Sequence, residues 1–312
     1  MKKVWILLCF AAAFLFAEEA PPKKMGGVAP FFFADLIYWK VWQGGMAFAN
    51  TGFLPPVERL GKTFEPDFQG EVGFRVGVGV SLAHDEWDLS LQYTWIHSHV
   101  GDRVTRDPAL EPLQMLWPFG GNFAPIHEAY ADWDFRMHVL DLEWGRPVCT
   151  SRFLMLRPFF GLKGFWSGQE YRIKYFAPEG VDHLHLDQDN WGIGIRMGLK
   201  TSWYFAEHWS FYGDLALASA WTHFDEKRKD QVNDEAMIHA KFDHYGMTPI
   251  LELGTGLRWE MGFHEGDYHV AVQVGWEEQV WGDYNRLLQV NETDSLGNLD
   301  FQGLTARLRF DF

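Results

Sequence analysis

The stretch "WDLSLQYTW", residues 87–95, alternates large apolar residues with polar ones at every position. One side of an extended chain would carry Trp87, Leu89, Leu91, Tyr93 and Trp95, and the other would carry Asp88, Ser90, Gln92 and Thr94. This period of two predicts a β-strand with one apolar face. Such a face either covers a soluble core or contacts lipid, and the rest of the chain decides between the two.

The same period recurs along most of the chain. It predicts ten strands, over 34–43, 71–82, 87–95, 130–144, 152–166, 191–203, 209–221, 251–261, 268–281 and 303–312. Within 130–144 the alternation changes phase near Val139–Asp141, which predicts a β-bulge.

The connections between these segments alternate strictly between short and long. Short turns are expected near 83–86, 146–151, 205–208 and 262–267, and long loops near 44–69, 98–129, 175–189, 225–246 and 286–298. Outer-membrane barrels combine an even number of antiparallel strands with short periplasmic turns and long extracellular loops. The sequence therefore predicts an all-β, up-and-down transmembrane barrel of ten strands, or twelve if a hairpin lies within 99–129.

A soluble β-sandwich is the competing architecture, but its strands usually have about 5–6 residues. The alternating segments here match the roughly 9–11 residues of a tilted membrane strand. Aromatic residues favour the membrane interface, and they occupy both ends of these segments. We predict interface positions for Trp87, Trp95, Trp133, Trp144, Trp191, Trp203, Trp209, Trp221, Trp259 and Phe312.

The N-terminus has the pattern of a secretory signal peptide. Lys2 and Lys3 precede the apolar run 4–17, which is too short to span a membrane, and the small residue Ala17 precedes an acidic stretch. We therefore expect residues 1–17 to be a cleaved signal peptide, 18–30 a short periplasmic segment, and 31–312 the barrel in a bacterial outer membrane. An uncleaved N-terminal anchor is the alternative.

Charge and cysteine content limit the partners. With 27 Lys and Arg against 42 Asp and Glu, the chain lacks the basic surface that binding nucleic acid requires. Cys149 is the single cysteine after the signal peptide, so no internal disulfide can form. An odd cysteine in an exported protein is either inert or forms an intermolecular disulfide, and a homo-oligomer remains open.

The face opposite the predicted lipid face carries charged residues and many glycines. We predict that it lines the barrel lumen through Arg75, Asp88, Arg136, Arg196, Lys200, Asp214, Glu252, Arg258, Glu277, Arg307 and Arg309. These charges could line a conducting pathway or pair with one another and fill the lumen. Ten strands lie nearer the filled eight-stranded barrels than the wide porins. The prediction is a narrow, water-filled passage for small solutes. The alternative is a structural or adhesive surface barrel that acts through acidic extracellular loops without conducting.

Two features suggest other chemistry. In "DHLHLD" (182–187), His183, His185 and Asp187 share one side of an extended chain, but same-side neighbours lie about 6.6 Å apart and cannot converge on one ion unless the chain bends. His223 and Asp225 lie near the extracellular rim, yet the strand phase points them outward. We therefore expect no metal site, no cofactor and no enzymatic activity.

Several of these segments resemble one known family. "ADLIYWKVWQGGMAFA" (34–49), "GFRVGVGVSLAHDEWDLSLQYTW" (73–95) and "VGWEEQVW" (274–281) are similar to strands of the Legionella-type major outer membrane protein family, as are residues 140–166 and 191–219. That resemblance implies a pore-forming outer-membrane barrel in contact with lipid, and no catalytic residues. The final "GLTARLRFDF" (303–312) resembles the C-terminal signal that such barrels present, through Phe312, to their assembly machinery.

Overall fold

The computed structural model describes residues 28–51, 53–54, 57–58, 61–82, 87–107, 113–117, 126–178, 180–233, 235–264, 267–287 and 297–312. The predicted signal peptide and most of the predicted periplasmic segment lie outside these residues. Among the described residues, no helix is long and apolar enough to cross a membrane.

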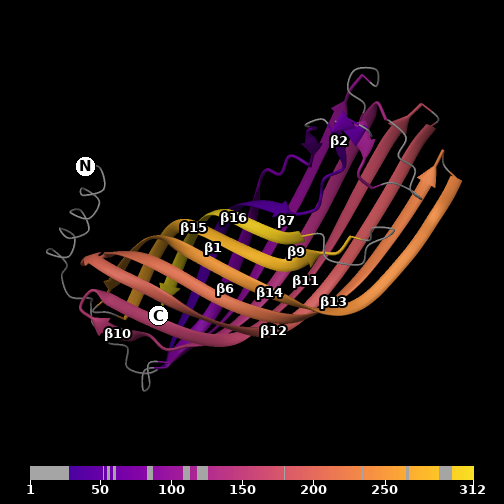
Figure 1. Ribbon diagram of the computed structural model, residues 1–312. Coiled ribbons are helices and arrows are strands. Elements are labelled where there is room, and N and C mark those ends of the chain that lie inside the picture. The colour runs from indigo at the N-terminus through magenta and orange to yellow at the C-terminus, as the bar shows by residue number, and fades with distance from the viewer. Residues whose placement is uncertain are drawn as a thin grey trace, which may run out of the picture.

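Long antiparallel strands form a closed ring (Figure 1). In chain order they are β1 (Val28–Gln43), β6 (Gly70–Leu82), β7 (Asp88–Thr105), β9 (Glu128–Gly145), β11 (Leu154–Ala177), β12 (Gly180–Ala206), β13 (Trp209–Val232), β14 (Glu235–Phe263), β15 (Tyr268–Asn285) and β16 (Gly297–Asp311). Each strand pairs with the next one in this order, and β16 pairs with β1 to close the ring. The small strand β10 lies between β9 and β11 in sequence, but these two pair directly with each other. The ring has ten strands, and the predicted all-β barrel is confirmed.

The short strands do not belong to the ring. β10 (Val148–Ser151) folds back on β11 within a predicted turn. β2 (Ala49–Thr51) pairs with both β5 (Thr63–Phe64) and β8 (Leu113–Met115), while β3 (Phe53–Leu54) pairs with β4 (Val57–Glu58). No wall hairpin is found in the described part of 99–129, because β7 simply continues to Thr105 and β8 pairs with β2. The twelve-strand alternative therefore fails.

The two ends of the barrel differ. Short turns join strands at the end where β1 begins and β16 ends, with Phe312 N–H donating to Pro30 O over 3.0 Å; we call this the turn end and the opposite end the loop end. At the loop end, two predicted loops are wrong: 175–189 and 225–246 are mostly strand. Here β11 to β14 continue as paired hairpins, with β7 and β9 running beside β11, and these six strands extend well past β1, β6, β15 and β16 (Figure 1). We call residues 168–189 and 223–243 the projecting sheet.

The opening stretch has the predicted direction. Leu89 and Leu91 are each 41% exposed on the outer surface, whereas Asp88 and Thr94 are 9% and 7% exposed inside. Because the exposed side chains of the neighbouring strands are also apolar, the outer wall is a continuous apolar band. The apolar face of 87–95 therefore covers no core and faces outward, as a lipid-contacting strand requires.

The predicted bulge in β9 is wrong. Its pairing with β7 and β11 runs without a shift from Glu128 to Gly145. Odd-numbered residues point inward throughout, so Trp133 is fully buried in the lumen and Arg136 lies on the outside with a side chain 66% exposed. The sequence predicts Trp133 on the outside and Arg136 in the lumen, and both predictions are wrong. They fail because the lumen beside this half of β9 is apolar rather than polar.

The remaining interface aromatics lie on the outer wall. Trp144, Trp203, Trp209 and Phe312 are 45–47% exposed near the turn end, and Trp191 and Trp221 are 44% and 47% exposed toward the loop end. Trp87, Trp95 and Trp259 are partly exposed on the same surface. The loop-end row also contains Trp166, which was not predicted from the sequence; it is 47% exposed and stacks on His138 at 5.1 Å. Trp166 on β11 therefore occupies the loop-end interface, where the sequence predicts Trp133 of β9.

Candidate functional site

The lumen next to the turn end and in the middle of the barrel is charged. It contains ten of the eleven predicted lumen residues, namely Arg75, Asp88, Arg196, Lys200, Asp214, Glu252, Arg258, Glu277, Arg307 and Arg309. Arg136 is the exception. These residues come from seven different wall strands, so their convergence depends on closure of the ring.

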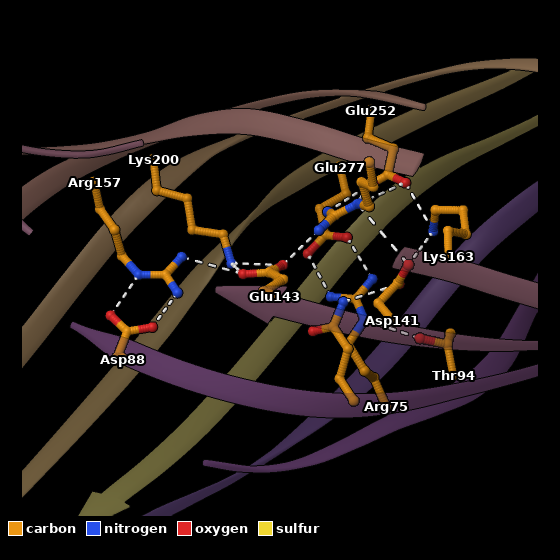
Figure 2. Close-up of polar contacts among 12 residues, drawn as sticks. Arg75, Asp88, Thr94, Asp141, Glu143, Arg157, Lys163, Lys200, Glu252 and Glu277 are labelled. Atoms are coloured by element: carbon orange, nitrogen blue, oxygen red, sulfur yellow. Dashed lines mark hydrogen bonds and ion pairs between the residues drawn. The ribbon is translucent and has the colours of Figure 1, made fainter. Parts of the chain in front are cut away.

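One continuous chain of ion pairs crosses the lumen (Figure 2). Arg157 on β11 pairs with Asp88 on β7 and with Glu143 on β9, the latter over 3.1 Å. Glu143 also accepts from Arg196 at 2.5 Å and Lys200 at 2.7 Å, both on β12. Its side chain is only 2% exposed, so this carboxylate is the centre of the chain.

The chain continues away from the turn end. Arg196 pairs with Glu252 of β14 at 2.5 Å, and Lys163 of β11 then joins Glu252 at 2.9 Å to Asp141 of β9 at 2.7 Å. Four cations thus alternate with four carboxylates across the lumen. Because the four positive charges balance the four negative ones, this chain of ion pairs has no net charge.

A second cluster lies on the other side of the lumen. Arg75 on β6 pairs with Asp35 on β1 and Glu277 on β15, both at 2.9 Å, and Arg307 on β16 pairs with Asp35 at 2.7 Å. This cluster is also neutral. The two clusters form a charged layer without the excess of one sign that charge selectivity in a pore requires.

Five members of this layer were not predicted from the sequence: Asp35, Asp141, Glu143, Arg157 and Lys163. Arg157 and Lys163 could have been found, because the even-numbered residues of 154–166 are almost all apolar and leave the odd-numbered ones inside. Asp141 and Glu143 were obscured by the supposed bulge. Asp35 lies on a strand with apolar residues on both faces, so alternation gives no signal there.

Two small cavities flank the layer. One, of about 60 Å³, lies among Arg75, Lys163, Arg196 and Glu277, and the other, of about 100 Å³, lies nearer the turn end beside Arg258. Both are lined by charged groups and are large enough for water molecules. The lumen is therefore wettable beside the ion pairs, although the pairs themselves narrow it.

An apolar plug closes the lumen toward the loop end. Wall side chains such as Trp133, Phe135 and Trp281 point into it and are fully buried. The centre is filled by residues that belong to no wall strand, namely Met46, Phe48, Ala49, Phe64, Phe68, Leu113, Met115, Trp117 and Ile126. We call these nine residues, with the backbone of 44–49, the plug.

Hydrogen bonds hold the plug against the wall. The hydroxyls of Tyr171 and Tyr175 on β11 donate to the carbonyls of Met46 and Phe48 over 2.6 and 2.7 Å. Trp117 Nε1–H donates to Ala47 O over 2.7 Å within the plug. The carbonyl of Phe48 also accepts from Leu116 N–H over 3.2 Å. The two tyrosine bonds link the plug directly to the wall strand β11 and so fix its position.

One buried carboxyl group lies on the inward-facing side of the projecting sheet, nearer the loop end than Trp221. Glu226 on β13 is 3% exposed, and its Oε1 is 3.6 Å from His244 Nδ1 on β14. Burial raises the pKa of Glu226 to about 8, and burial lowers the pKa of His244. Near neutral pH both groups are therefore held in their uncharged forms.

Comparison with known proteins identifies the family. Residues 32–312 match the family described as Legionella pneumophila major outer membrane protein precursor. The chain belongs to this family. The resemblance inferred from the strand sequences is thus confirmed, and this member of the family is an outer-membrane β-barrel protein. No curated protein matches the chain.

Three solved structures of similar shape are distant in sequence. The outer membrane protease OmpT from Escherichia coli is 8% identical, covers 93% of this chain and 99% of its own, and has a TM-score of 0.46. A major outer membrane protein from Thermus thermophilus is 12% identical, with coverages of 91% and 99% and a TM-score of 0.35. The P. putida toluene transporter TodX is 11% identical, with coverages of 92% and 90% and a TM-score of 0.35. At these scores the likenesses carry no functional inference.

Proposed function

We propose that the protein is a porin-like barrel with a narrow, water-filled passage for small solutes, which the plug holds closed in this conformation. The observation that carries the proposal is the composition of the lumen. Its turn-end half is charged and contains cavities, and the obstruction at the loop end is built largely from segments outside the wall. Displacement of those segments would leave the ring of strands intact.

The charged layer sets the character of the passage. Because its two clusters are each neutral, we expect weak discrimination between small anions and cations. The closely spaced ion pairs also leave little free cross-section, so we expect exclusion of solutes larger than a monosaccharide.

Solute efflux from proteoliposomes tests the proposal. Vesicles containing the mature protein should release K⁺ and a monosaccharide faster than vesicles containing none, and should retain a trisaccharide. Release no faster than from protein-free vesicles, with the protein shown to be folded and inserted, would overturn the proposal. Release of the trisaccharide would also contradict it, because the lumen would then be wider than the ion pairs allow.

A second candidate is a non-conducting surface barrel, and the projecting sheet favours it. About ten residues of each of β12, β13 and β14 continue past Trp191, Trp221 and Tyr245, which corresponds to roughly 30 Å of strand. Replacement of 229–239 by an Asn-Gly turn would shorten this sheet, because Arg228 and Ala240 are paired in register. Loss of surface attachment in this variant, together with wild-type efflux no faster than from protein-free vesicles, would support the second candidate. Unchanged attachment in the shortened variant would count against it.

A further inference from the structure

The outer face of the projecting sheet carries a group of side chains with the chemistry of a metal site. Glu170 on β11 and His185 and Asp187 on β12 each offer one ligand atom, and these atoms all lie within 4.8 Å of one another. We propose that these three residues bind a divalent transition-metal ion of the zinc class. The proposal is independent of the passage, because the site lies on the outside of the wall.

The third ligand comes from the neighbouring strand. His185 and Asp187 alone share one side of β12, and a further ligand on that strand would be about 6.6 Å away, which is why no convergent site is visible in the sequence. In the structure, Glu170 is the register partner of Asp187 and Arg172 that of His185. The Oε1 of Glu170 therefore reaches to 2.9 Å from His185 Nε2, and Asp187 Oδ1 lies 3.0 Å from the same nitrogen.

These distances between ligand atoms are close to those found around a bound ion. Zinc binds imidazole nitrogen and carboxylate oxygen at about 2.0–2.2 Å in tetrahedral geometry, which places neighbouring ligand atoms roughly 3.3 Å apart. The two contacts of His185 would therefore need to lengthen by a few tenths of an ångström. Pairing of β11 with β12 is continuous from Leu154 to Ala177, so the two strands present the ligands on a fixed frame.

The donor set and its surroundings fit such an ion. One imidazole and two carboxylates suit zinc-class metals rather than magnesium or calcium, which favour oxygen ligands alone. The side chains of His185, Glu170 and Asp187 are 35%, 28% and 28% exposed, so an ion can enter and at least one position stays open to an outside ligand. Asp187 is four residues beyond Trp191, about 10 Å past the aromatic row.

Arg172 provides an internal test of the geometry. Its guanidinium donates to the same Oε1 of Glu170 that faces His185, over 2.5 Å from Nη2 and 2.9 Å from Nε. This cation both competes for the oxygen and repels a metal ion. Removal of Arg172 should therefore strengthen metal binding, whereas a purely structural role for Glu170 gives no reason for such a gain.

The experiment is Zn²⁺ titration by calorimetry of the untagged, folded protein in detergent, with Co²⁺ absorption as a second readout. We expect one site in the wild type, at least about tenfold weaker binding in His185→Ala and in Glu170→Gln, and tighter binding in Arg172→Ala. His183→Ala is the matched control, since His183 shares the strand and face but lies outside the trio, and it should bind as the wild type does. Co²⁺ should give the strong visible bands of a four-coordinate ion.

Three results would overturn the proposal. The first is equal loss of Zn²⁺ binding in His183→Ala and His185→Ala, which would mean that surface histidines bind without a built site. The second is unchanged binding in Glu170→Gln together with no gain in Arg172→Ala, which would remove the cross-strand ligand. The third is absence of binding by the wild type at neutral pH. Solute efflux would be unaffected in each case, so failure here and failure of the proposed passage are distinguishable.

Discussion

Substitution of Glu143 by Gln tests whether the charged layer is a closed network of ion pairs. Glu143 pairs with Arg157, Arg196 and Lys200 at 3.1, 2.5 and 2.7 Å, and its side chain is 2% exposed. The change keeps the shape of the side chain but leaves its cluster with one uncompensated positive charge. Breaking a buried pair in this way costs about 3–5 kcal/mol. Because two cavities beside the layer can hold water, we expect a loss of about 3 kcal/mol in the free energy of unfolding, at the lower end of that range.

The assay is urea-induced unfolding of the protein in lipid vesicles, followed by tryptophan fluorescence. Asp134→Asn is the control, because Asp134 lies on the same strand but faces outward and is paired at the surface, where loss of a pair costs no more than about 1 kcal/mol. The double variant Glu143→Gln/Lys200→Met restores neutrality and should recover part of the loss. A loss below about 1 kcal/mol for Glu143→Gln would refute the reasoning, since the lumen charges would then be solvated as in an open, water-filled channel.

Three further predictions concern the wall, the rim and the turn end. Ile195→Arg, in the middle of the apolar band, should destabilise the inserted barrel by about 2–4 kcal/mol, and Trp203→Arg at the interface by no more than about 1 kcal/mol; equal costs in vesicle unfolding would contradict the position of the band. Because the pKa of Glu226 is raised to about 8, the folded state holds a proton that the unfolded state has lost, so stability should fall as pH rises from about 4.5 to 8. Glu226→Gln should flatten this slope in unfolding measured across that range, and an unchanged slope would assign it to another group. Cys149 is exposed on β10, so a maleimide should label the folded protein as fast as a small thiol, and protection from labelling would place Cys149 in a contact.

The sequence predicted the barrel because lipid imposes a simple rule on the wall. Wherever a strand crosses the apolar band, its outer residues must be apolar, and the period of two is visible. The rule identifies Leu91 as outward and Asp88 as inward from the sequence alone. The same rule, with alternating short and long connections, predicted the number of strands.

The rule fails where the surroundings change. Past the aromatic row the outer face meets water, so His185 and Asp187 on β12 give no apolar alternation, and the projecting sheet was predicted as loops. Inside the loop end the lumen is filled by the plug and is itself apolar. Trp133 is therefore buried inward and Arg136 faces out, opposite to a rule that assumes a polar lumen. The first exception depends on where the strands leave the membrane and the second on which segments fill the barrel, and the alternation within one strand records neither.

The central claim is that the plug, rather than the wall, closes the passage, and single-channel recording in planar bilayers tests it most directly. Tyr171→Phe/Tyr175→Phe removes the two hydroxyls that hold the backbone of Met46 and Phe48. Loss of these two hydrogen bonds should destabilise the closed state by about 2 kcal/mol. This corresponds to roughly a thirtyfold gain in open probability. We predict rare, small conductance steps for the wild type and frequent steps of the same size for the double variant. Absence of steps from both, with both proteins folded and inserted, would contradict the claim and favour a non-conducting barrel.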